Sequence, residues 1–253
     1  MTAVEAHVRM LRTLDDPEPY LLEHSGLPGP RGNIELAQAA ADVRPAQELR
    51  RWASLDAQAA PTGGAEEFLA FCGVLGLGRE LVEGDTDALH QLREHANDPR
   101  WRVREAVAMA LQRWGREDFD GLATAMADWG SGSWLERRGA AAALCEPALL
   151  TNPGRVRATL GVLEAVTAPV ASAEPAERRS DEYKALRKGL GYCWSVAVAA
   201  APEVGRPAFE SLARRAAESG DRDLRWLVRE NLRKRRLERL DPDWVTALLA
   251  RLA

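Results

Sequence analysis

The segment DPRWRVREAVAMAL, residues 98–111, recurs in altered form twice further along the chain. The related segments are SGSWLERRGAAAAL (131–144) and DLRWLVRENLRKRR (223–236). Each contains a tryptophan, an arginine three residues later and apolar residues at helical spacing, and the first two tryptophans are 33 residues apart. Because a helix-turn-helix repeat has about this length, the sequence predicts a stack of similar helical hairpins.

A residue type that commonly caps helices precedes each of these tryptophans by three positions. These residues are Asp98, Ser131 and Asp223. Their side-chain oxygens can accept a hydrogen bond from an amide of the first helical turn, which has no partner within the helix. We therefore expect them to be N-caps of the three related helices.

The remaining sequence also favours helices. Apolar residues recur at helical spacing, and the alternation typical of β-strands does not occur. The predicted fold class is all-α, as a right-handed α-solenoid of about six helical hairpins in one domain, 1–253. Hairpins over 1–85 would precede the repeats of 86–253. The expected helices span 3–13, 17–25, 33–43, 45–54, 65–82, 86–96, 100–114, 117–128, 133–146, 154–168, 181–200, 204–218, 222–238 and 242–252.

Composition excludes several classes of protein. The 253 residues are 46% hydrophobic with a formal net charge of −4, and apolar runs such as SVAVAAAP (195–202) are too short to cross a bilayer. We expect a cytoplasmic protein without a membrane partner. The three cysteines are far apart and form no CxxC pair, so no metal site is expected and they are interpreted as buried apolar residues. No nucleotide-binding or metalloprotease motif occurs, and no cofactor is expected.

Helical wheels separate an apolar face from a second face that carries aromatic and basic residues. In 100–114 the expected core residues are Val103, Ala106, Val107, Ala110, Leu111 and Trp114; in 181–200 they are Leu190, Cys193, Trp194, Ala197, Val198 and Ala201; and in 222–238 they are Leu224, Leu227, Val228 and Leu232. The opposite faces hold Trp101, Arg104 and Glu105, then Trp134, Arg137 and Arg138, then Lys188, Tyr192 and Ser195, and finally Trp226 with Arg225, Arg229, Arg233 and Arg236. If these helices form the inner layer of the solenoid, the aromatic residues line one concave groove.

Two interpretations of these arginines remain open. Arginines beside aromatic rings can neutralise phosphates and stack bases. Alternatively, repeat arginines pair with acidic caps of neighbouring repeats and form a structural ladder. The ladder is favoured for Arg104, Arg137 and Arg229, which occupy the repeat position. For Arg225, Arg233, Arg235 and Arg236, which exceed what the repeat needs, ligand contact stays open beside the alternative of a simply solvated helix face.

The repeats resemble HEAT repeats, in which an Asp and then a Val-Arg pair often open the second helix, as Asp98, Val103 and Arg104 do. RKGLGYCWSVAVAAAP (187–202) and SWLERRGAAAAL (133–144) resemble helices of the AlkD-like DNA alkylation repair glycosylases. The resemblance covers roughly residues 86–238. It implies a basic concave groove for duplex DNA and removal of alkylated purines by a carboxylate, assisted by two tryptophans and an arginine.

Carried over to this chain, the resemblance places Arg137 at the family's arginine, Trp101 at one tryptophan and Tyr192 at the other. The catalytic position has two alignments. Matching Trp101 places Glu105 there, whereas matching the apolar core places Arg104 there. An arginine cannot replace a carboxylate in this chemistry.

The segment HSGLPGPRGNIELAQAAAD (24–42) contains a turn rich in proline and glycine, and Asn33 is the expected N-cap of the following helix. It resembles a segment of bacterial HEAT-repeat proteins. The turn is interpreted as a hairpin connection. The alternative is that Arg31, with the amides of Gly32 and Asn33, holds an anion at the helix start.

Three functions follow from these observations. The first is a binding module whose groove takes a polyanion, with DNA as the leading candidate. The second is an AlkD-like DNA glycosylase that uses Glu105. The third is a non-catalytic scaffold for a protein partner, which the acidic composition favours. Salt dependence separates the first from the third, because binding to DNA phosphates weakens steeply as salt is added.

Overall fold

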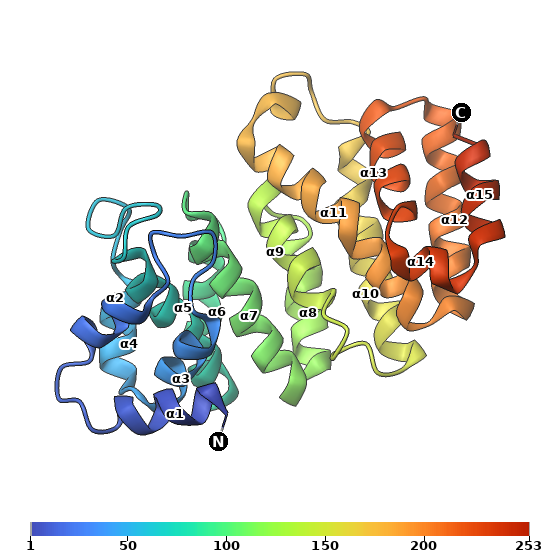
Figure 1. Ribbon diagram of the computed structural model, residues 1–253. Coiled ribbons are helices and arrows are strands. Elements are labelled where there is room, and N and C mark those ends of the chain that lie inside the picture. Colours follow the sequence, from blue (N-terminus) through green and yellow to red (C-terminus); the bar gives the residue numbers. More distant parts are fainter. Residues whose placement is uncertain (1, 253) are drawn as a thin grey trace. The chain divides into compact units, whose positions relative to one another are not determined.

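The computed structural model describes residues 2–252, which contain fifteen α-helices, two short 3₁₀ helices and no strand (Figure 1). The all-α prediction is therefore confirmed. The described chain divides into two compact units, one ending at Glu117 and the other beginning at Asp118.

The first unit contains α1 (Ala3–Leu11), α2 (Glu18–His24), α3 (Ile34–Val43), α4 (Ala46–Ala53), α5 (Glu67–Val82), α6 (Asp87–His95) and α7 (Trp101–Glu117). The second contains α8 (Phe119–Trp129), α9 (Trp134–Leu144), α10 (Pro153–Thr167), η1 (Ala168–Val170), η2 (Glu177–Arg179), α11 (Asp181–Ala200), α12 (Pro202–Ser219), α13 (Arg222–Leu232), α14 (Arg235–Leu240) and α15 (Pro242–Ala250). Thirteen of the fourteen expected helices begin and end within three residues of their predicted bounds. The exception is the segment 222–238.

Helix α5 is the centre of the first unit and packs against α2, α3, α4, α6 and α7. Its sequence, EFLAFCGVLGLGRELV, is apolar on all sides, as is typical of a helix surrounded by protein. Glycines allow the close approach of its neighbours. A Cβ atom on Gly73 would lie 2.2 Å from the backbone nitrogen of Ala53 in α4, and one on Gly78 would lie 2.6 Å from the carbonyl oxygen of Ala110 in α7.

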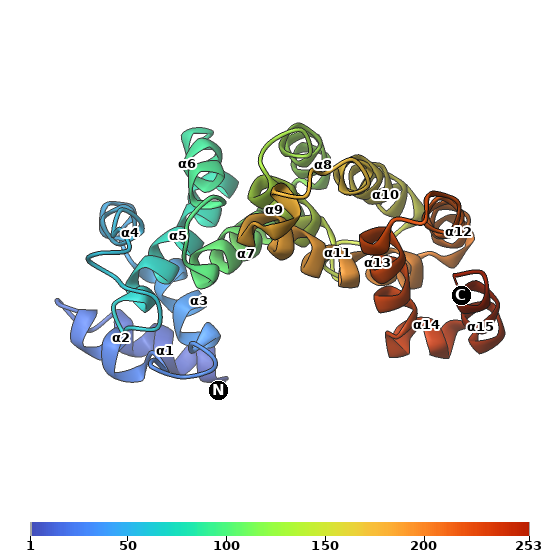
Figure 2. The same cartoon turned by 90° about the horizontal axis from the view of Figure 1, so that it is seen from above.

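The second unit is built from helical pairs stacked in two layers (Figure 2). Helices α8, α10 and α12 form one layer, and α9, α11 and α13 form the other. Contacts join each helix to its neighbour along the chain and to the next helix in its own layer. Because α11 contacts both α9 and α13, residues of these three helices share one side of the unit.

The predicted core faces are largely confirmed. All the apolar residues assigned to the core of 100–114, 181–200 and 222–238 are buried except Trp114, which is half-buried. Ser195 was placed on the outer face of its helix and is buried. Its backbone amide donates to the Oδ1 atom of Asn231, 2.8 Å away in α13, so α11 is covered on this side as well.

The predicted helix 222–238 is wrong, because the segment forms two helices. Helix α13 ends at Leu232, Lys234 has extended backbone angles (φ −78°, ψ 126°), and α14 begins at Arg235. In one continuous helix Leu237 would be rotated by about 140° from Leu232, away from the core. The extended residue resets this phase, and both leucines are buried. Arg236 consequently lies on a different helix from Arg225, Arg229 and Arg233, so the four do not form the single stripe that was predicted.

Two of the three predicted N-caps are also wrong. Ser133, not Ser131, caps α9 by accepting from the amide of Glu136, and Asp221, not Asp223, caps α13 by accepting from the amides of Asp223 and Leu224. Helix α9 therefore begins two residues later than the predicted cap implies, and α13 begins two residues earlier. Asp98 accepts the amide of Arg100 at 2.7 Å, directly before α7. The predicted cap Asn33 is confirmed, since its Oδ1 atom accepts from the amide of Leu36.

Candidate anion-binding groove

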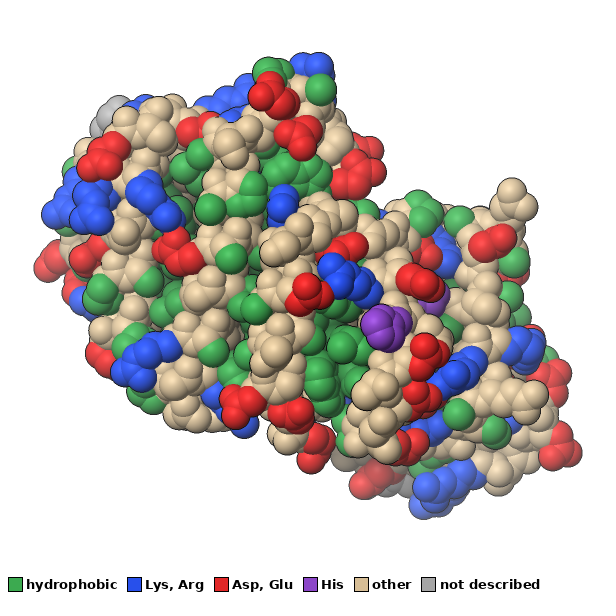
Figure 3. All heavy atoms as spheres, turned by 180° about the vertical axis from the view of Figure 1, so that it is seen from behind, with side chains coloured by type: hydrophobic (Ala, Val, Ile, Leu, Met, Phe, Trp, Pro, Cys, Tyr) green, Lys and Arg blue, Asp and Glu red, His purple; other side chains and the backbone are tan. Residues whose placement is uncertain are grey.

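An open cavity of about 600 Å³ lies in the second unit between η2, α11 and α13. Its lining residues are Arg178, Tyr183, Lys184, Arg187, Arg222, Asp223, Trp226, Arg229 and Arg233, and we call it the Trp226 groove. Six of these nine residues are arginine or lysine and one is acidic. On the face of the second unit that Figure 3 draws, acidic and basic side chains are interspersed. Cationic side chains are therefore concentrated at this groove in a chain whose net charge is −4.

The single carboxylate of the groove organises its inner end. Asp223 is buried, and its Oδ2 atom accepts from Arg178 at 3.0 Å and from the Tyr183 hydroxyl at 2.9 Å. Its Oδ1 atom lies 2.8 Å from Nε of Arg187. Burial, together with the bond to Asp223, raises the pKa of the Tyr183 phenol, which stays protonated as a donor. Asp223 is thus shared among several donors and neutralises only part of the groove's positive charge.

The guanidinium group of Arg178 is bonded to two carboxylates and two backbone carbonyl oxygens, so Arg178 has a structural role. Besides Asp223, it pairs with Asp221 at 2.8 Å and donates to the carbonyl oxygens of Ala173 and Ala171 at 2.8 and 3.0 Å. The hydrogen bond from its guanidinium to Asp221 is the main reason that the pKa of Arg178 is raised. Arg178 therefore ties the segment before α11 to the start of α13.

Trp226 is half-buried and covered by neighbouring residues. The guanidinium carbon of Arg187 lies 3.7 Å from the centre of the indole ring, and a Cβ atom on Gly191 would meet the ring at 3.0 Å. The indole therefore fills the contact between α11 and α13, with Arg187 over one face. Its predicted role as an open platform for base stacking is not supported by this packing.

Several predicted groove arginines bind backbone carbonyls at the ends of other segments. Arg225 donates to Ala216 and Ala217 near the end of α12 at 3.3 and 3.2 Å, and Arg229 donates to Leu252. Arg137 donates to Gly130 at 3.0 Å and lies over its own repeat tryptophan, Trp134, at 4.7 Å. In the first unit, Arg104 donates to Pro99 at 2.8 Å. These arginines therefore have structural roles. The ladder interpretation predicted such a role for Arg104, Arg137 and Arg229, but with acidic caps as partners. The bonds described here go to backbone carbonyl oxygens instead.

The cations with the greatest exposure are at the outer end of the groove. The side chain of Arg222 is 79% exposed and lies 4.0 Å from Asp223, while that of Arg233 is 70% exposed and pairs with Glu230 at 3.5 Å. Lys184 is exposed and pairs with the solvated Asp181. Exposed pairs of this kind are weak, so these three side chains are available to an anionic ligand.

Tyr192 and Arg236 form a second cluster on α11 and α14. Tyr192 is 44% exposed, as predicted, and Arg236 lies over its ring at 4.4 Å and donates to its hydroxyl at 2.7 Å. The neighbouring Lys188 is exposed. Trp134, by contrast, packs edge-on against Tyr183 with ring centres 5.3 Å apart. Of the predicted aromatic residues in this unit, Tyr192 alone is strongly exposed.

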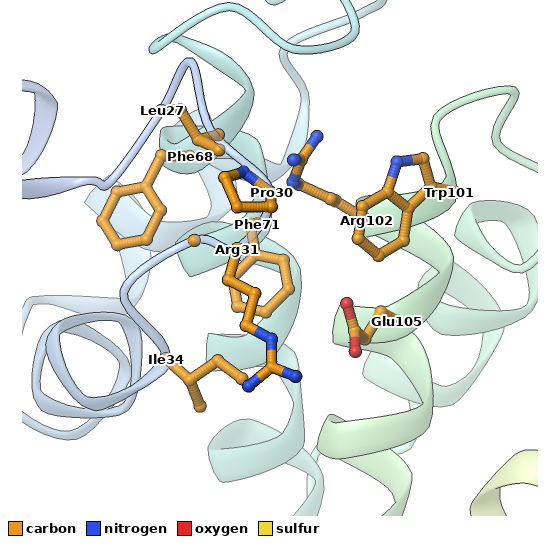
Figure 4. Close-up of a pocket in the computed structure, with 10 residues that line it drawn as sticks. Leu27, Pro30, Arg31, Ile34, Phe68, Phe71, Trp101, Arg102 and Glu105 are labelled. Atoms are coloured by element: carbon orange, nitrogen blue, oxygen red, sulfur yellow. The ribbon is translucent and has the colours of Figure 1, made fainter.

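The other predicted site residues belong to the first unit. Trp101 is 44% exposed and Glu105 is half-buried, and both line a cavity that also contains Arg31 (Figure 4). Arg137 and Tyr192, which the glycosylase resemblance groups with these residues, belong to the second unit. No single unit contains the complete set of residues that the resemblance implies.

Sequence reasoning missed the groove contributions of Lys184, Arg187 and Arg222. A signal was present for two of them, because Lys184, Arg187 and Lys188 have the three- and four-residue spacings that place side chains on one helical face. The buried role of Asp223 had no such signal. It depends on Arg178, which is 45 residues away in sequence, and on Tyr183, which is 40 residues away.

No family model, curated protein or solved structure matches this chain. Within residues 2–252, no helix is long and apolar enough to cross a membrane, and no three His, Cys, Asp or Glu side chains are grouped as metal ligands would be. The three cysteines, Cys72, Cys145 and Cys193, are buried and unpaired, in agreement with their interpretation as apolar residues.

The capping residue Asp221 predicts how stability depends on pH. Burial alone would raise its pKa, but the bond from Arg178 and the amides of Leu224 and Asp223 outweigh this effect, and the pKa of Asp221 is lowered. A lowered folded-state pKa contributes stability above the unfolded value of about 3.9, and this stability is lost as the pH falls through the folded value. We expect Asp221→Asn to lower the melting temperature at pH 7, and the difference from the unmodified protein to shrink below about pH 4. A difference that stays constant down to pH 2.5 in thermal melts would contradict this assignment.

Proposed function

We propose that this protein binds a polyanion through the Trp226 groove, and that the polyanion is double-stranded DNA. The observation that carries the proposal is one open cavity lined by six cations and a single, already shared carboxylate, in which Lys184, Arg222 and Arg233 have exposed side chains. Phosphates spaced along a backbone match such a row of guanidinium and ammonium groups, and their neutralisation releases counterions. The acidic net charge of the whole chain makes this concentration of cations a specific feature of the groove.

The geometry favours contact with the DNA backbone over contact with bases. Arg222, Arg233 and Lys184 have exposed ends that can reach phosphate oxygens, whereas Trp226 is covered by Arg187. Phosphate contacts position a protein on DNA but carry no sequence information. Binding is therefore expected to be independent of sequence, and a duplex should be preferred to a single strand that needs open aromatic surfaces.

The same proposal extends to the repeat type. The hairpins α8–α9, α10–α11 and α12–α13, stacked in two layers, support a right-handed solenoid of HEAT-like repeats. A relationship to the AlkD-like DNA-binding proteins would agree with this arrangement and with a groove on the layer that holds α11 and α13. Glycosylase activity remains a prediction from sequence, because the residues it requires are divided between the two units.

Charge reversal in the groove provides the test. In Arg222→Glu/Arg233→Glu, two exposed cations become anions, and we expect affinity for a short duplex of arbitrary sequence to fall about tenfold or more at low salt. The slope of log affinity against log salt concentration should become flatter by about two, because two phosphate contacts are lost. Fluorescence anisotropy over a salt series measures both quantities. Since both side chains are exposed, the melting temperature should change little.

The matched control is Arg157→Glu/Arg214→Glu, which makes the same change in net charge at exposed positions of α10 and α12 that do not line the groove. This variant should bind DNA with nearly the affinity of the unmodified protein. Equal losses in the two variants would show that binding follows total charge and would refute the groove assignment. Absence of duplex binding at low salt would refute the function itself and leave the protein-scaffold interpretation.

A further inference from the structure

The first unit contains a second cavity, of about 310 Å³, which is independent of the Trp226 groove (Figure 4). It lies between the turn that precedes α3, helix α5 and the first turns of α7. Its lining residues are Leu27, Pro30, Arg31, Gly32, Ile34, Phe68, Phe71, Trp101, Arg102 and Glu105. The cavity thus combines the proline-glycine turn with two of the residues, Trp101 and Glu105, that the sequence singled out for other reasons.

Arg102 holds the turn over the cavity. Its side chain is almost fully buried and donates to the carbonyl oxygen of Gly29 at 2.7 Å and to the carboxylate of Glu67 at 3.0 Å. Glu67 is completely buried and also accepts the amide of Gly63 at 2.8 Å. At the other end of the turn, the amide of Asn33 donates to the carbonyl oxygen of Ser25 at 2.7 Å. The turn is fastened at two places, so the cavity is formed before any ligand arrives.

The walls of the cavity are apolar and aromatic. Phe68 and Phe71 in α5 are 1% and 5% exposed and form the inner wall. Ile34 and Trp101 are 41% and 44% exposed, and they are two of only six large hydrophobic residues exposed within residues 2–252. Apolar surface that is left open next to a preformed cavity is typical of a ligand site.

Two opposite charges face this apolar space. Arg31 comes from the turn and Glu105 from α7, and Figure 4 shows both charged groups turned toward the space between the two elements. Within the described chain, neither side chain makes a hydrogen bond or an ion pair. Arg102, the third charged group, is already bonded to Gly29 and Glu67. The cavity therefore offers one cation and one carboxylate, separated from each other and available to a ligand.

We propose that this cavity binds a free α-amino acid with a large apolar side chain. The ammonium group of the ligand pairs with Glu105, and its carboxylate accepts the two parallel N–H groups that the fork of Arg31 offers. The side chain of the ligand packs against Phe68, Phe71 and Trp101. A volume of about 310 Å³ is at the lower end for ligand pockets, which fits a single amino acid and not a nucleotide or a peptide. Trp101 and Glu105 are four residues apart on α7, so the ammonium group lies near the indole ring as well.

A set of three ligands tests the two charges separately. L-Phenylalanine has both charges, phenethylamine lacks the carboxylate, and 3-phenylpropionate lacks the ammonium group. We expect L-phenylalanine to bind with a one-to-one ratio in isothermal titration calorimetry, each of the other two to bind about fivefold more weakly, and glycine, which has no apolar side chain, not to bind. Equal affinities for the three aromatic ligands would show an apolar cavity without the proposed charge recognition. If nuclear magnetic resonance detects no saturation transfer from the protein to L-phenylalanine at millimolar concentrations, the proposal is overturned.

Two variants connect each charge to its residue. Glu105→Gln should weaken L-phenylalanine and phenethylamine about fivefold while leaving 3-phenylpropionate unchanged, and Arg31→Gln should weaken L-phenylalanine and 3-phenylpropionate but not phenethylamine. Arg116→Gln, at an exposed position of α7 outside the cavity, is the matched control and should bind all three ligands normally. Within residues 2–252, neither substitution removes a side-chain hydrogen bond or ion pair, so melting temperatures should change little. If either variant weakened the binding of both phenethylamine and 3-phenylpropionate, the assigned pairing of charges would be contradicted.

Discussion

Replacing Asp223 by alanine is expected to lower the free energy of unfolding by about 3 kcal/mol. The carboxylate is 5% exposed and interacts with Arg178, Arg187 and the hydroxyl of Tyr183. Removing it leaves these donors without their shared acceptor at a site that water reaches poorly. The cost of an unpaired buried group exceeds the net value of the contact that was lost. Urea denaturation followed by far-ultraviolet circular dichroism measures the change.

Two further variants separate the charge of Asp223 from its hydrogen bonding. Asp223→Asn keeps an oxygen that can accept from Tyr183 but removes the negative charge, so an intermediate loss of stability is expected. Asp181→Ala removes a carboxylate that is 95% exposed and pairs only with Lys184, and it should cost less than about 1 kcal/mol. If Asp223→Ala were no more destabilising than Asp181→Ala, Asp223 would not organise the inner end of the groove.

The division of roles among the arginines explains why a basic stretch near the end of an acidic chain can serve both folding and binding. Arg178, Arg225 and Arg229 are held by carboxylates or carbonyl oxygens and stabilise the contacts of α13 with its surroundings. Arg222 and Arg233 extend from the same helix or its end and remain largely solvated. Substitution of the first group should affect stability, whereas substitution of the second should affect the affinity for anions.

The core faces could be predicted from sequence because the burial of a helix follows from the spacing of its own apolar residues. Val103 and Val107, Leu190 and Trp194 were assigned to the core on this basis and all are fully buried. The exposure of Trp101 and Tyr192, on the opposite faces, follows from the same geometry. These predictions needed no knowledge of which helices are neighbours.

The hydrogen-bond partners of the groove arginines could not be predicted from the spacing of apolar residues. Arg225 reaches carbonyl oxygens at the end of α12 and Arg229 reaches Leu252, so their partners depend on how successive helices stack. A helical wheel places the guanidinium groups on one side but does not show which carbonyl oxygens are there. The division of 222–238 was more accessible, because the five-residue spacing of Leu232 and Leu237 cannot place both on one helical face.

The cap of α13 shows a different limit. Asp221 and Asp223 are both good N-cap residues two positions apart, and local sequence does not distinguish between them. The Asp223 carboxylate accepts from Arg178 and from the Tyr183 hydroxyl, whereas Asp221 accepts from the amides of the first turn and also pairs with Arg178. The choice of cap therefore depends on the bond to Tyr183, which is forty residues away in sequence.

Gly73 of α5 lies directly against the backbone of α4. A Cβ atom at this position would lie 2.2 Å from the backbone nitrogen of Ala53 and 2.5 Å from the carbonyl oxygen of Leu49. These are backbone atoms of α4 and cannot move aside as the end of a flexible side chain can. The whole of α4 would have to shift away from the central helix, exposing the contact that buries Leu49 and Trp52.

We therefore expect Gly73→Ala to lower the free energy of unfolding by about 3 kcal/mol, although alanine has the higher helix propensity. The matched control is Gly161→Ala in the middle of α10, where a Cβ atom would meet nothing within 4 Å. There the same substitution should stabilise the protein by about 0.5–1 kcal/mol, because only the propensity changes. Urea denaturation of the two variants gives the comparison directly. If both substitutions shift the midpoint in the same direction, the close approach of α4 and α5 at Gly73 is not a determinant of this fold; opposite shifts would show that the glycine is required by the packing of the two helices.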